Sequence, residues 1–377
     1  MDALLTLNTG SSSIKFRLFG LTETLPFLLG GKVTDLGGAP VFQVHAAEDS
    51  RDEITPLPAG TTHAEALAHV LDWLHTHPHD WTLKAAAHRI VHGGERYRAP
   101  IRLDTEAMTY LRGLCPLAPL HQPHNLHAVE ALWQQQPDLA QYGCFDTAFH
   151  ATQDALHRSY ALPPSIRAQG VRRYGFHGLS YEWIAHRLHR DHPTLAEGRV
   201  VAAHLGNGAS LCAMRGGKSL DTTMGMTALD GLPMGTRCGN LDAGAVLYMQ
   251  RTLGLSLAAI EDLLYNDSGL KGLSGISNDV KTLSDSPAPE ARFALDYFVW
   301  KCTQQIAAMA ATLGGIDTLV FTGGIGENAQ DLRARIVAGV GFLGPFTTLV
   351  IPANEERSMA GSLYAQYFTS STQRSMP

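Results

Sequence analysis

Alternating apolar and polar residues near the start of the chain predict a β-hairpin. Apolar side chains occupy every second position over 5–7 and 14–18, on either side of a polar segment over 8–13. A period of two residues places these side chains on one face of each strand, and the polar segment forms the tip. The segment 41–44 is expected to add a third strand.

The predicted tip is rich in hydrogen-bond donors. Gly10 precedes three serines, including Ser11 and Ser13, and Lys15 follows them. Backbone N–H groups and hydroxyls in such a loop can point at one anion, and Lys15 adds a positive charge. A phosphate loop at Ser11 and Ser13 is one interpretation, which depends on the rest of the chain for support. The alternative is an ordinary polar turn, because Asn, Gly and Ser are common in turns.

A similar unit recurs in the second half of the chain. Apolar strands over 199–205 and 209–214 flank a Gly-Asn-Gly turn over 206–208. Farther on, a buried strand over 317–321 leads into a glycine loop over 322–328 and then a helix. A strand, a glycine loop and a helix in this order let the backbone approach a nucleotide closely. The repeat predicts a duplicated architecture in which each half offers a hairpin tip to a shared cleft.

Several helices are marked by their ends. Thr62 begins a capping-box pattern, and apolar residues follow it at helical spacing through Leu74. Asp242 is expected to cap a helix that closes at Gly254, and a long amphipathic helix over 290–313 stops at a glycine pair.

Two charged residues stand where predicted strands end. Arg89 lies on a strand of small residues over 85–90, just before a glycine pair. An unpaired buried guanidinium is costly, so Arg89 is expected to point into a cleft, unless it pairs with a nearby carboxylate such as Glu95. Asp146 ends another short strand, where a metal-binding or catalytic carboxylate and a helix cap are both common.

Composition narrows the class of protein. A chain of 377 residues exceeds one ordinary core, which favours two domains. Its net charge of −6 gives no electrostatic case for nucleic acid or an anionic membrane, so small substrates are expected. Five scattered cysteines imply neither a disulfide framework nor a zinc site. The absence of a signal-peptide pattern and of a transmembrane-length apolar run predicts a cytoplasmic protein.

Two further segments are expected to be exposed. His75, His77 and His79 alternate beside Pro78, which is more typical of a surface loop than of a metal site. The polar tail from Ser370 lacks any core pattern.

Eight motifs occur in the order in which acetate kinases carry them. They are the segments 8–15, 88–94, 145–150, 174–178, 204–208, 234–237, 324–328 and 354–356. The match spans essentially the whole chain, which resembles this family throughout. The family belongs to the acetate and sugar kinase, Hsp70 and actin superfamily. The resemblance therefore implies an α/β fold with two RNase H-like domains and a nucleotide cleft between them.

The resemblance also implies domain ranges, cofactor and assembly. Residues 1–149 with 356–377 would form an N-terminal domain on the carboxylate-substrate side, and residues 150–355 a C-terminal domain on the nucleotide side. ATP would be a substrate and Mg²⁺, with Mn²⁺ as a substitute, the metal. Members of the family are commonly homodimers.

By the same resemblance, individual residues take roles. The metal ligands would be Asn8 and Glu355. The catalytic residues would be Arg89, which binds the carboxylate, the essential Asp146, and the phosphoryl-binding His177 and Arg237. The nucleotide contacts would be Lys15, His204, Leu205, Gly206, Asn207, Gly208, Asp279, Val280, Lys281, Gly324, Ile325, Gly326, Glu327 and Asn328. The acyl pocket, together with Arg89, would be lined by Val91, Leu120, Phe176 and Ala228.

These residue types suit phosphoryl transfer to a carboxylate. A loose transition state needs charge stabilisation and in-line positioning more than covalent help. A carboxylate is already nucleophilic, so the reaction requires no strong base. Two arginines are useful because the carboxylate and the γ-phosphate repel each other and must be held close together.

Four positions depart from the family pattern. Tyr181 stands where histidine is frequent and His124 where proline is usual, and neither is expected to touch the chemistry. Lys281 stands where the family commonly has an arginine. The lysine would offer a point charge in place of the forked guanidinium, so ATP binding would be weaker. Ala228 replaces a proline in the acyl pocket. A smaller side chain in the pocket wall would leave room for one more methylene group in the acid. Discrimination between two acids that differ by one methylene group is typically worth about 1 to 3 kcal/mol.

The sequence therefore predicts an ATP:acetate phosphotransferase that forms acetyl phosphate and ADP reversibly by direct in-line transfer. A propionate kinase of the same family is the alternative within this class. A non-catalytic, nucleotide-gated protein on the same fold would need the ATP loops but not the four catalytic residues together. A sugar kinase has a hydroxyl acceptor, which gives no reason for paired arginines.

Overall fold

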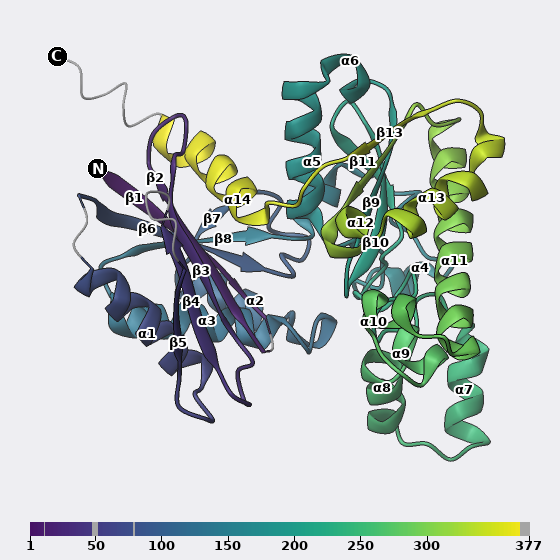
Figure 1. The fold of residues 1–377 in the computed structure, drawn as a ribbon, viewed down its shortest axis with the longest axis horizontal. Helices are drawn as coiled ribbons and strands as arrows, with labels where there is room; N and C mark the ends of the chain where they lie inside the picture. The colour runs from purple at the N-terminus through teal and green to yellow at the C-terminus, as the bar shows by residue number, and fades with distance from the viewer. Residues whose placement is uncertain (11, 47–51, 78–79, 370–377) are drawn as a thin grey trace. The chain divides into compact units, whose positions relative to one another are not determined.

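The structure is a computed structural model that describes residues 1–10, 12–46, 52–77 and 80–369 (Figure 1). The chain divides into two compact units, residues 1–148 with 354–377 and residues 149–353. The domain ranges expected from the sequence differ from these units by one residue at the first boundary and by two at the second. Two predicted features, His79 and the tail from Ser370, lie outside the described residues.

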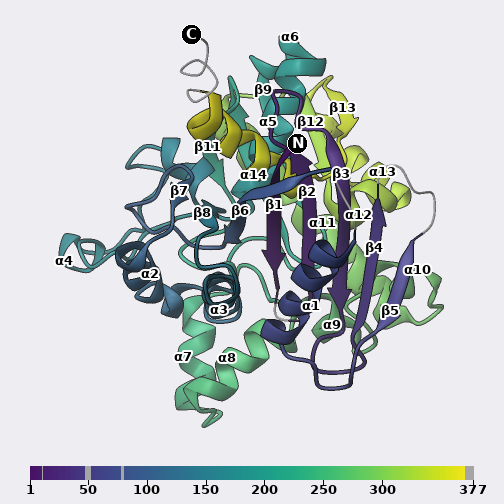
Figure 2. The ribbon, with the colours of Figure 1, turned by 90° about the vertical axis from the view of Figure 1, so that its left-hand side faces the viewer.

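The first unit is built on an eight-stranded sheet with the order β5-β4-β3-β2-β1-β6-β8-β7. Its strands are β1 (Asp2–Thr9), β2 (Ile14–Gly20), β3 (Phe27–Thr34), β4 (Val41–Ala46), β5 (Glu53–Pro56), β6 (Thr82–Ile90), β7 (Ile101–Arg102) and β8 (Ala140–Phe145). Its helices are α1 (His63–Thr76), α2 (Thr105–Arg112), α3 (Gln122–Gln135) and α14 (Glu355–Leu363), with the short turns η1 (Cys115–Leu117) and η4 (Tyr364–Phe368). Helices α1 and α3 pack on each other and on the sheet, and α14 packs on β1, β2 and β6 (Figure 2). The central strand β1 is buried over 3–7, so both of its faces are covered.

The second unit has a five-stranded sheet with the order β11-β10-β9-β12-β13. Its strands are β9 (Arg199–Leu205), β10 (Ala209–Arg215), β11 (Lys218–Thr222), β12 (Thr318–Thr322) and β13 (Thr347–Val350). Its helices and helical turns are η2 (Ala148–Thr152), α4 (Pro164–Arg167), α5 (Gly178–Asp191), α6 (Pro193–Ala196), α7 (Ala243–Arg251), α8 (Leu257–Asn266), α9 (Gly269–Ser274), α10 (Val280–Asp285), α11 (Pro289–Leu313), α12 (Gly323–Asn328), α13 (Gln330–Gly339) and η3 (Gly341–Leu343). Helix α11 covers one face of the sheet and α5 with α6 the other (Figure 1).

The two sheets share a five-strand topology. In the first unit, β3, β2 and β1 are antiparallel neighbours, and β6 and β8 continue the sheet in parallel with β1. In the second unit, β11, β10 and β9 are antiparallel neighbours, and β12 and β13 continue in parallel with β9. The predicted duplication is confirmed. In each unit the hairpin tip lies at the same edge of the sheet as the end of the next parallel strand.

Local predictions hold where capping chemistry is strong. The side chain of Thr62 accepts from the Glu65 backbone, and Glu65 accepts from the Thr62 backbone at 2.8 Å, which completes the predicted capping box of α1. Helix α11 ends at Gly314, whose φ of 72° is left-handed. Glycine adopts this left-handed conformation at little cost, because it has no Cβ atom.

Two local predictions need correction. The segment 41–44 belongs to β4 rather than to a third strand, because β3 precedes it. Strand β3 lacks clear alternation, since Gly31 packs too tightly for a side chain: a Cβ there would lie 2.3 Å from the Gln43 carbonyl oxygen. The glycine loop expected over 322–328 is the helix α12, whose Gly323 N–H donates to Glu327 Oε1 at 3.0 Å.

Within the ranges that the structure describes, no helix combines the length and the apolar character needed to cross a membrane.

Three buried histidines make the stability of the fold depend on pH. Burial lowers the pKa of His88, His92 and His150 from 6.5 to about 4. The unfolded chain binds protons at these rings near pH 6.5, whereas the folded chain does so only near pH 4, so acid favours unfolding across this window. We expect the free energy of unfolding to fall by about 2 kcal/mol per histidine between pH 7.5 and 5, measured by urea titration.

A matched pair of variants separates this effect from general acid sensitivity. His150→Gln should make the pH dependence shallower, whereas His127→Gln, at an exposed position of α3, should leave it unchanged. A free energy of unfolding that stays level from pH 7.5 to 5 would contradict the burial of neutral histidines.

Candidate active site

A buried arginine–carboxylate pair lies where β6 and β8 end in the first unit. Arg89 Nε donates to both carboxylate oxygens of Asp146, at 3.1 and 3.2 Å, and Arg89 Nη2 lies 2.6 Å from Asp146 Oδ2. The Asp146 side chain is 2% exposed and that of Arg89 20%. Such fork geometry fixes both side chains. Arg89 takes this partner, where the sequence also allowed Glu95.

Asn8 and Glu355 complete the cluster around Arg89. Arg89 Nη1 lies 3.3 Å from Asn8 Oδ1 and 3.3 Å from Glu355 Oε2, and Asn8 Nδ2 donates to Glu355 Oε2 at 3.2 Å. Burial alone would lower the pKa of Arg89, but the charges of Asp146 and Glu355 outweigh it and raise this pKa above its ordinary value. Arg89 therefore stays protonated.

Glu355 reaches this cluster because α14 begins beside the first sheet. The side chain of Asn354 caps the helix, accepting from the Arg357 N–H at 3.1 Å and from Arg17 Nη1 at 3.0 Å. Arg17 lies on β2, so the cap also ties the helix to the sheet. A carboxylate in the first helical turn is stabilised by the helix dipole.

Two buried amides of α3 hold the ends of the central strands. Asn125 donates to the carbonyl of Thr9 at 2.6 Å and accepts from the backbone N–H of Val91 at 3.0 Å. Gln122 accepts from the His92 N–H at 3.0 Å and donates to the same residue's carbonyl at 3.0 Å. The ends of β1 and β6, and with them Asn8 and Arg89, are fixed by one helix.

The tip of the first hairpin is a tight turn. Gly10 N–H donates to the Ser13 carbonyl at 2.8 Å, and the His63 ring is hydrogen-bonded to the Gly10 carbonyl at 2.8 Å. Lys15 is exposed on β2, opposite Asn8. Ser11, one of the two serines of the predicted phosphate loop, lies outside the described residues.

In the second unit, His177 and Arg237 converge on Gly208. A Cβ at Gly208 would lie 3.1 Å from His177 Nε2 and 4.0 Å from Arg237 Nη1. Arg237 Nη1 donates to the carbonyl of Ala228 at 3.1 Å. The His177 ring stacks on His204 with centroids 4.2 Å apart. The glycine leaves room for two cationic or hydrogen-bonding groups beside the hairpin tip.

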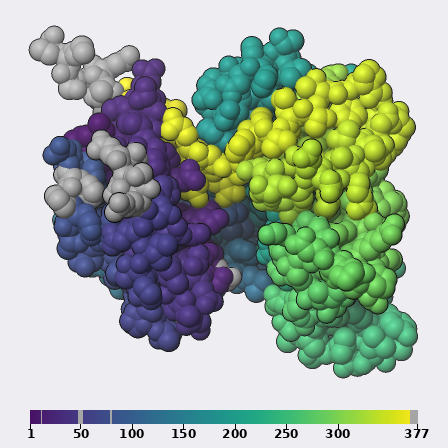
Figure 3. Space-filling view, in the orientation of Figure 1, coloured from purple at the N-terminus to yellow at the C-terminus, as the bar shows by residue number. Residues whose placement is uncertain are grey.

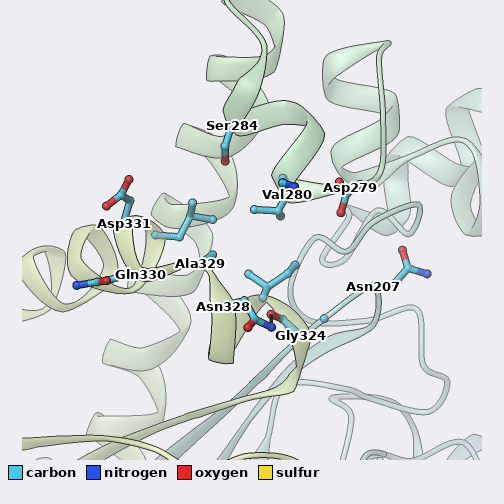
Figure 4. Close-up of a pocket in the computed structure, with 13 residues that line it drawn as sticks. Asn207, Asp279, Val280, Ser284, Gly324, Asn328, Ala329, Gln330 and Asp331 are labelled. Carbon is cyan, nitrogen blue, oxygen red and sulfur yellow. Dashed lines mark hydrogen bonds between the residues drawn. The ribbon is translucent and has the colours of Figure 1, made fainter. Parts of the chain in front are cut away.

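A pocket of about 760 Å³ opens beside the same tip (Figure 4). Val280 and Ser284 of α10 face Asn328 of α12 across it. Its lining residues are Gly206, Asn207, Asp279, Val280, Lys281, Ser284, Gly324, Ile325, Asn328, Ala329, Gln330, Asp331 and Leu332. A pocket of this volume that combines apolar side chains with polar and charged groups suits a small organic ligand with polar substituents.

Comparison with known proteins decides the family. The model of the acetokinase family matches residues 3–360. This chain belongs to the acetokinase family. It is 48% identical over 369 residues to the acetate kinase of Rhodopseudomonas palustris strain TIE-1, covering 97% of this chain and 92% of that protein. It is 42% identical over 348 residues to the acetate kinase of Deinococcus radiodurans, covering 90% of this chain and 86% of that protein.

Solved structures of the acetokinase family share the fold. A propionate kinase from Francisella tularensis matches with a TM-score of 0.90 and 31% identity, covering 96% of this chain and 99% of that one. The acetate kinase of Porphyromonas gingivalis matches with a TM-score of 0.84 and 32% identity, covering 96% of this chain and 98% of that one. The family, the enzyme class and the α/β fold with two RNase H-like units, all predicted from the sequence, are confirmed.

The acetokinase pocket contains part of the predicted nucleotide set. Eight of those residues line it, namely Gly206, Asn207, Asp279, Val280, Lys281, Gly324, Ile325 and Asn328. Glu327 does not line it, because its carboxylate accepts from the N–H groups of Gly323 and Ala353 at 3.0 and 2.9 Å. Lys15 lies in the first unit. The remaining four residues of the predicted set do not line it: His204, Leu205, Gly208 and Gly326.

The predicted acyl residues are divided between the units. Val91 is buried and Leu120 half-buried in the first unit, and Phe176 is buried and Ala228 half-buried in the second. Phe176 directly precedes His177, and the Ala228 carbonyl contacts Arg237. Val91 lies two residues beyond Arg89 on the same segment, whereas Leu120 is distant in sequence from the predicted catalytic residues.

Asn8 and Glu355 fit a Mg²⁺ ion as oxygen donors. Their side chains lie 3.2 Å apart, and magnesium in kinases commonly takes one or two protein oxygens plus phosphates and water. Among the residues that the structure describes, no cluster of three or more His, Cys, Asp or Glu side chains forms a self-sufficient metal cage. The donor set therefore suits a metal that arrives with a nucleotide.

Sequence reasoning missed several neighbours of these sites. Ser284, Gln330 and Asp331 line the pocket, although no motif pointed to them. Tyr181 was expected to lie away from the chemistry, but its hydroxyl lies 2.5 Å from Ser210 Oγ, which in turn contacts His177. Ser210 is the second residue of β10, directly after the predicted Gly-Asn-Gly turn, but no motif singled it out.

Proposed function

We propose that this protein is an ATP:acetate phosphotransferase that converts ATP and acetate to ADP and acetyl phosphate reversibly. The observation that carries the proposal is the fixed, protonated Arg89, which lies beside Asp146, Asn8 and Glu355 at one sheet edge. A guanidinium in this setting can hold a carboxylate. Membership in a family that includes named acetate kinases supports the choice of acid.

In this mechanism Arg89 binds the acetate carboxylate and Asp146 fixes the direction of the guanidinium. His177 and Arg237, which meet at Gly208, stabilise charge on the transferring phosphoryl group. The attacking oxygen is already anionic, so transfer depends on positioning and electrostatics. Asp146 also lies close to the reacting groups as the essential carboxylate of the family pattern.

The nucleotide would occupy the 760 Å³ pocket. Val280, Ile325 and Leu332 offer apolar contact to a base, and Asp279 and Asp331 offer acceptors to ribose hydroxyls. Lys281 would contribute a point charge. The backbone of Gly206 and Gly324 would approach the phosphates. Lys15 and Ser13 are further proposed phosphate contacts.

Mg²⁺, or Mn²⁺ in its place, would offset the charge of the polyphosphate when held by Asn8 and Glu355. Asn8 supplies a neutral amide oxygen and Glu355 a carboxylate. Arg89, hydrogen-bonded to both, keeps these side chains in place. We further propose that the first unit carries the carboxylate side of the reaction, the second unit the nucleotide side, and that the protein is cytoplasmic.

Removing either arginine tests the assignment. Arg89→Ala and Arg237→Ala should each lower kcat/KM for acetate by about 100-fold or more, because each removes charge stabilisation from the transition state. Acetate-dependent ADP formation measures this effect. Two variants serve as matched comparisons. Arg89→Lys keeps the positive charge but loses the forked guanidinium, and Arg102→Ala removes an exposed arginine. Turnover within a few-fold of wild type in both alanine variants would show that the site is wrongly assigned.

The acyl pocket decides between acetate and propionate. A propionate kinase remains the second candidate, since Ala228 leaves a smaller wall than proline. Ala228→Pro should raise the ratio of kcat/KM for acetate to that for propionate by about 5-fold or more, an effect of about 1 kcal/mol. Ala228→Val adds volume without restricting the backbone and should move the ratio the same way. An unchanged ratio in both variants would remove Ala228 from the pocket.

We propose that the protein is a homodimer. The stretch 241–257, which includes α7, reaches the surface at the lower end of the second unit (Figure 3). It exposes five large apolar side chains, namely Leu241, Leu247, Tyr248, Leu253 and Leu257. Monomeric proteins seldom expose a continuous patch of this kind, and a self-complementary contact would bury it in both copies.

A charge within this stretch tests the dimer. Leu247→Asp should convert a dimer into a monomer in size-exclusion chromatography with light scattering, because a buried carboxylate without a partner is costly. Leu156→Asp, at a residue 80% exposed elsewhere in the same unit, is the matched control and should remain dimeric. A wild-type protein that is monomeric at micromolar concentration would contradict the proposal.

A further inference from the structure

Three side chains of the second unit form a chain of hydrogen bonds that ends at His177. The Tyr181 hydroxyl lies 2.5 Å from Ser210 Oγ, and Ser210 Oγ lies 2.9 Å from His177 Nδ1. Tyr181 and Ser210 are both fully buried. His177 is the N-cap residue of α5, Tyr181 lies in the first turn of that helix, and Ser210 of β10 contacts both side chains.

Burial determines which atom donates in each bond. Burial raises the pKa of Tyr181 well above its ordinary value, so the phenol keeps its proton. A buried hydroxyl needs an acceptor, and among the described residues Ser210 Oγ is the acceptor in reach. Tyr181 therefore donates to Ser210.

The hydroxyl of Ser210 then donates its hydrogen bond to His177. A serine hydroxyl that accepts from Tyr181 has its own proton free to donate, and His177 Nδ1 is the neighbour at 2.9 Å. A neutral imidazole that accepts at Nδ1 carries its proton on Nε2. Nε2 is the ring atom that faces Gly208 and the side of Arg237.

The remaining contacts hold the ring in this orientation. The His204 ring stacks on it at 4.2 Å, and His204 is itself held by Ser180 at 2.8 Å. The backbone of His177 has a φ of 57°, a left-handed conformation that costs energy for a residue other than glycine. A strained residue that is stacked on one ring face and hydrogen-bonded at one ring nitrogen is typical of a preorganised site.

We propose that Tyr181 is a positioning residue, which acts through Ser210 to hold neutral His177 as the tautomer that presents its Nε2–H toward the phosphoryl site. The inference rests on the proposed function for the identity of the group that receives this N–H. The tautomer itself does not depend on it. Tyrosine at this position, a departure from the family pattern, therefore takes part in the site through a second side chain.

The tautomer is measured directly by ¹⁵N NMR of histidine-labelled protein above pH 8, with His177→Gln used to assign the signal. Wild type should show a protonated Nε2 and an unprotonated Nδ1. In Tyr181→Phe, Ser210 is released to accept as well as donate, and the signal should shift toward a mixture of both tautomers. Tyr142→Phe, which removes a buried phenol from the first unit, should leave the signal unchanged.

Kinetics separate positioning from folding. Tyr181→Phe should lower kcat by about fivefold with the KM values for ATP and acetate within twofold, since one hydrogen bond of about 1 kcal/mol supports the transition state. In a Ser210→Ala background, Tyr181→Phe should have no further effect, because the link to His177 is already cut. Additive losses in the double variant, or an Nδ1-protonated His177 in wild type, would overturn the proposal.

The two readouts also separate this proposal from the proposed function. If wild type forms no acyl phosphate but its His177 signal changes in Tyr181→Phe, the function is wrong and the positioning stands. If wild type is active and the tautomer is the same in both proteins, the positioning is wrong and the function stands.

Discussion

The stability of the first unit depends on the pairing of two buried charged side chains, because an unpaired buried charge destabilises a fold. Arg89 and Asp146 lie largely out of water, where either group alone would destabilise the fold by several kcal/mol. Each is therefore held by the other, and Asn8 and Glu355 both lie 3.3 Å from Nη1 of the guanidinium. The same constraint that keeps the fold together leaves a rigid cation at the sheet edge. A substrate carboxylate binds most strongly to a cation that need not reorganise.

The topology explains why these residues meet. Strands β1, β6 and β8 run in parallel, so their carboxyl ends share one edge, and Asn8, Arg89 and Asp146 stand at those ends. The second unit repeats the arrangement with β9 and β12, and there the edge carries the Gly206–Gly208 tip and α12. In the first unit, charged side chains lie at this edge of the sheet. In the second unit, the same edge brings the backbone close to a pocket.

Much of this was predictable from residue types. The hairpins, the capping box of α1 and the strand ends at Arg89 and Asp146 follow from local pattern, and the motif order identified the family. The partner of Arg89 was not predictable from the residues alone, because Asp146 and Glu355 are distant in sequence and meet only through parallel pairing and the return of α14. Each distant contact depends on a register that local propensity does not encode.

The misjudged positions share the same cause. Tyr181 is a departure from the family pattern whose importance depends on Ser210, 29 residues later on another element. Strand β3 was not predicted because Gly31 contributes no side chain to an alternating pattern. Close packing against Gln43 requires glycine at this position. In α12, the carboxylate of Glu327 stabilises helical backbone at glycines whose propensity favours a loop. In the first two cases a residue distant in sequence decides the outcome, and in α12 a side-chain contact within the helix outweighs glycine propensity.

Acyl phosphate formation tests the central claim most directly. The protein would be incubated with ATP and Mg²⁺ and with acetate, propionate, butyrate or no acid, and acyl phosphate trapped with hydroxylamine while ADP is measured in parallel. The account predicts hydroxamate in proportion to ADP, with acetate the best acid. ATP turnover that is independent of any acid and yields no hydroxamate would contradict it.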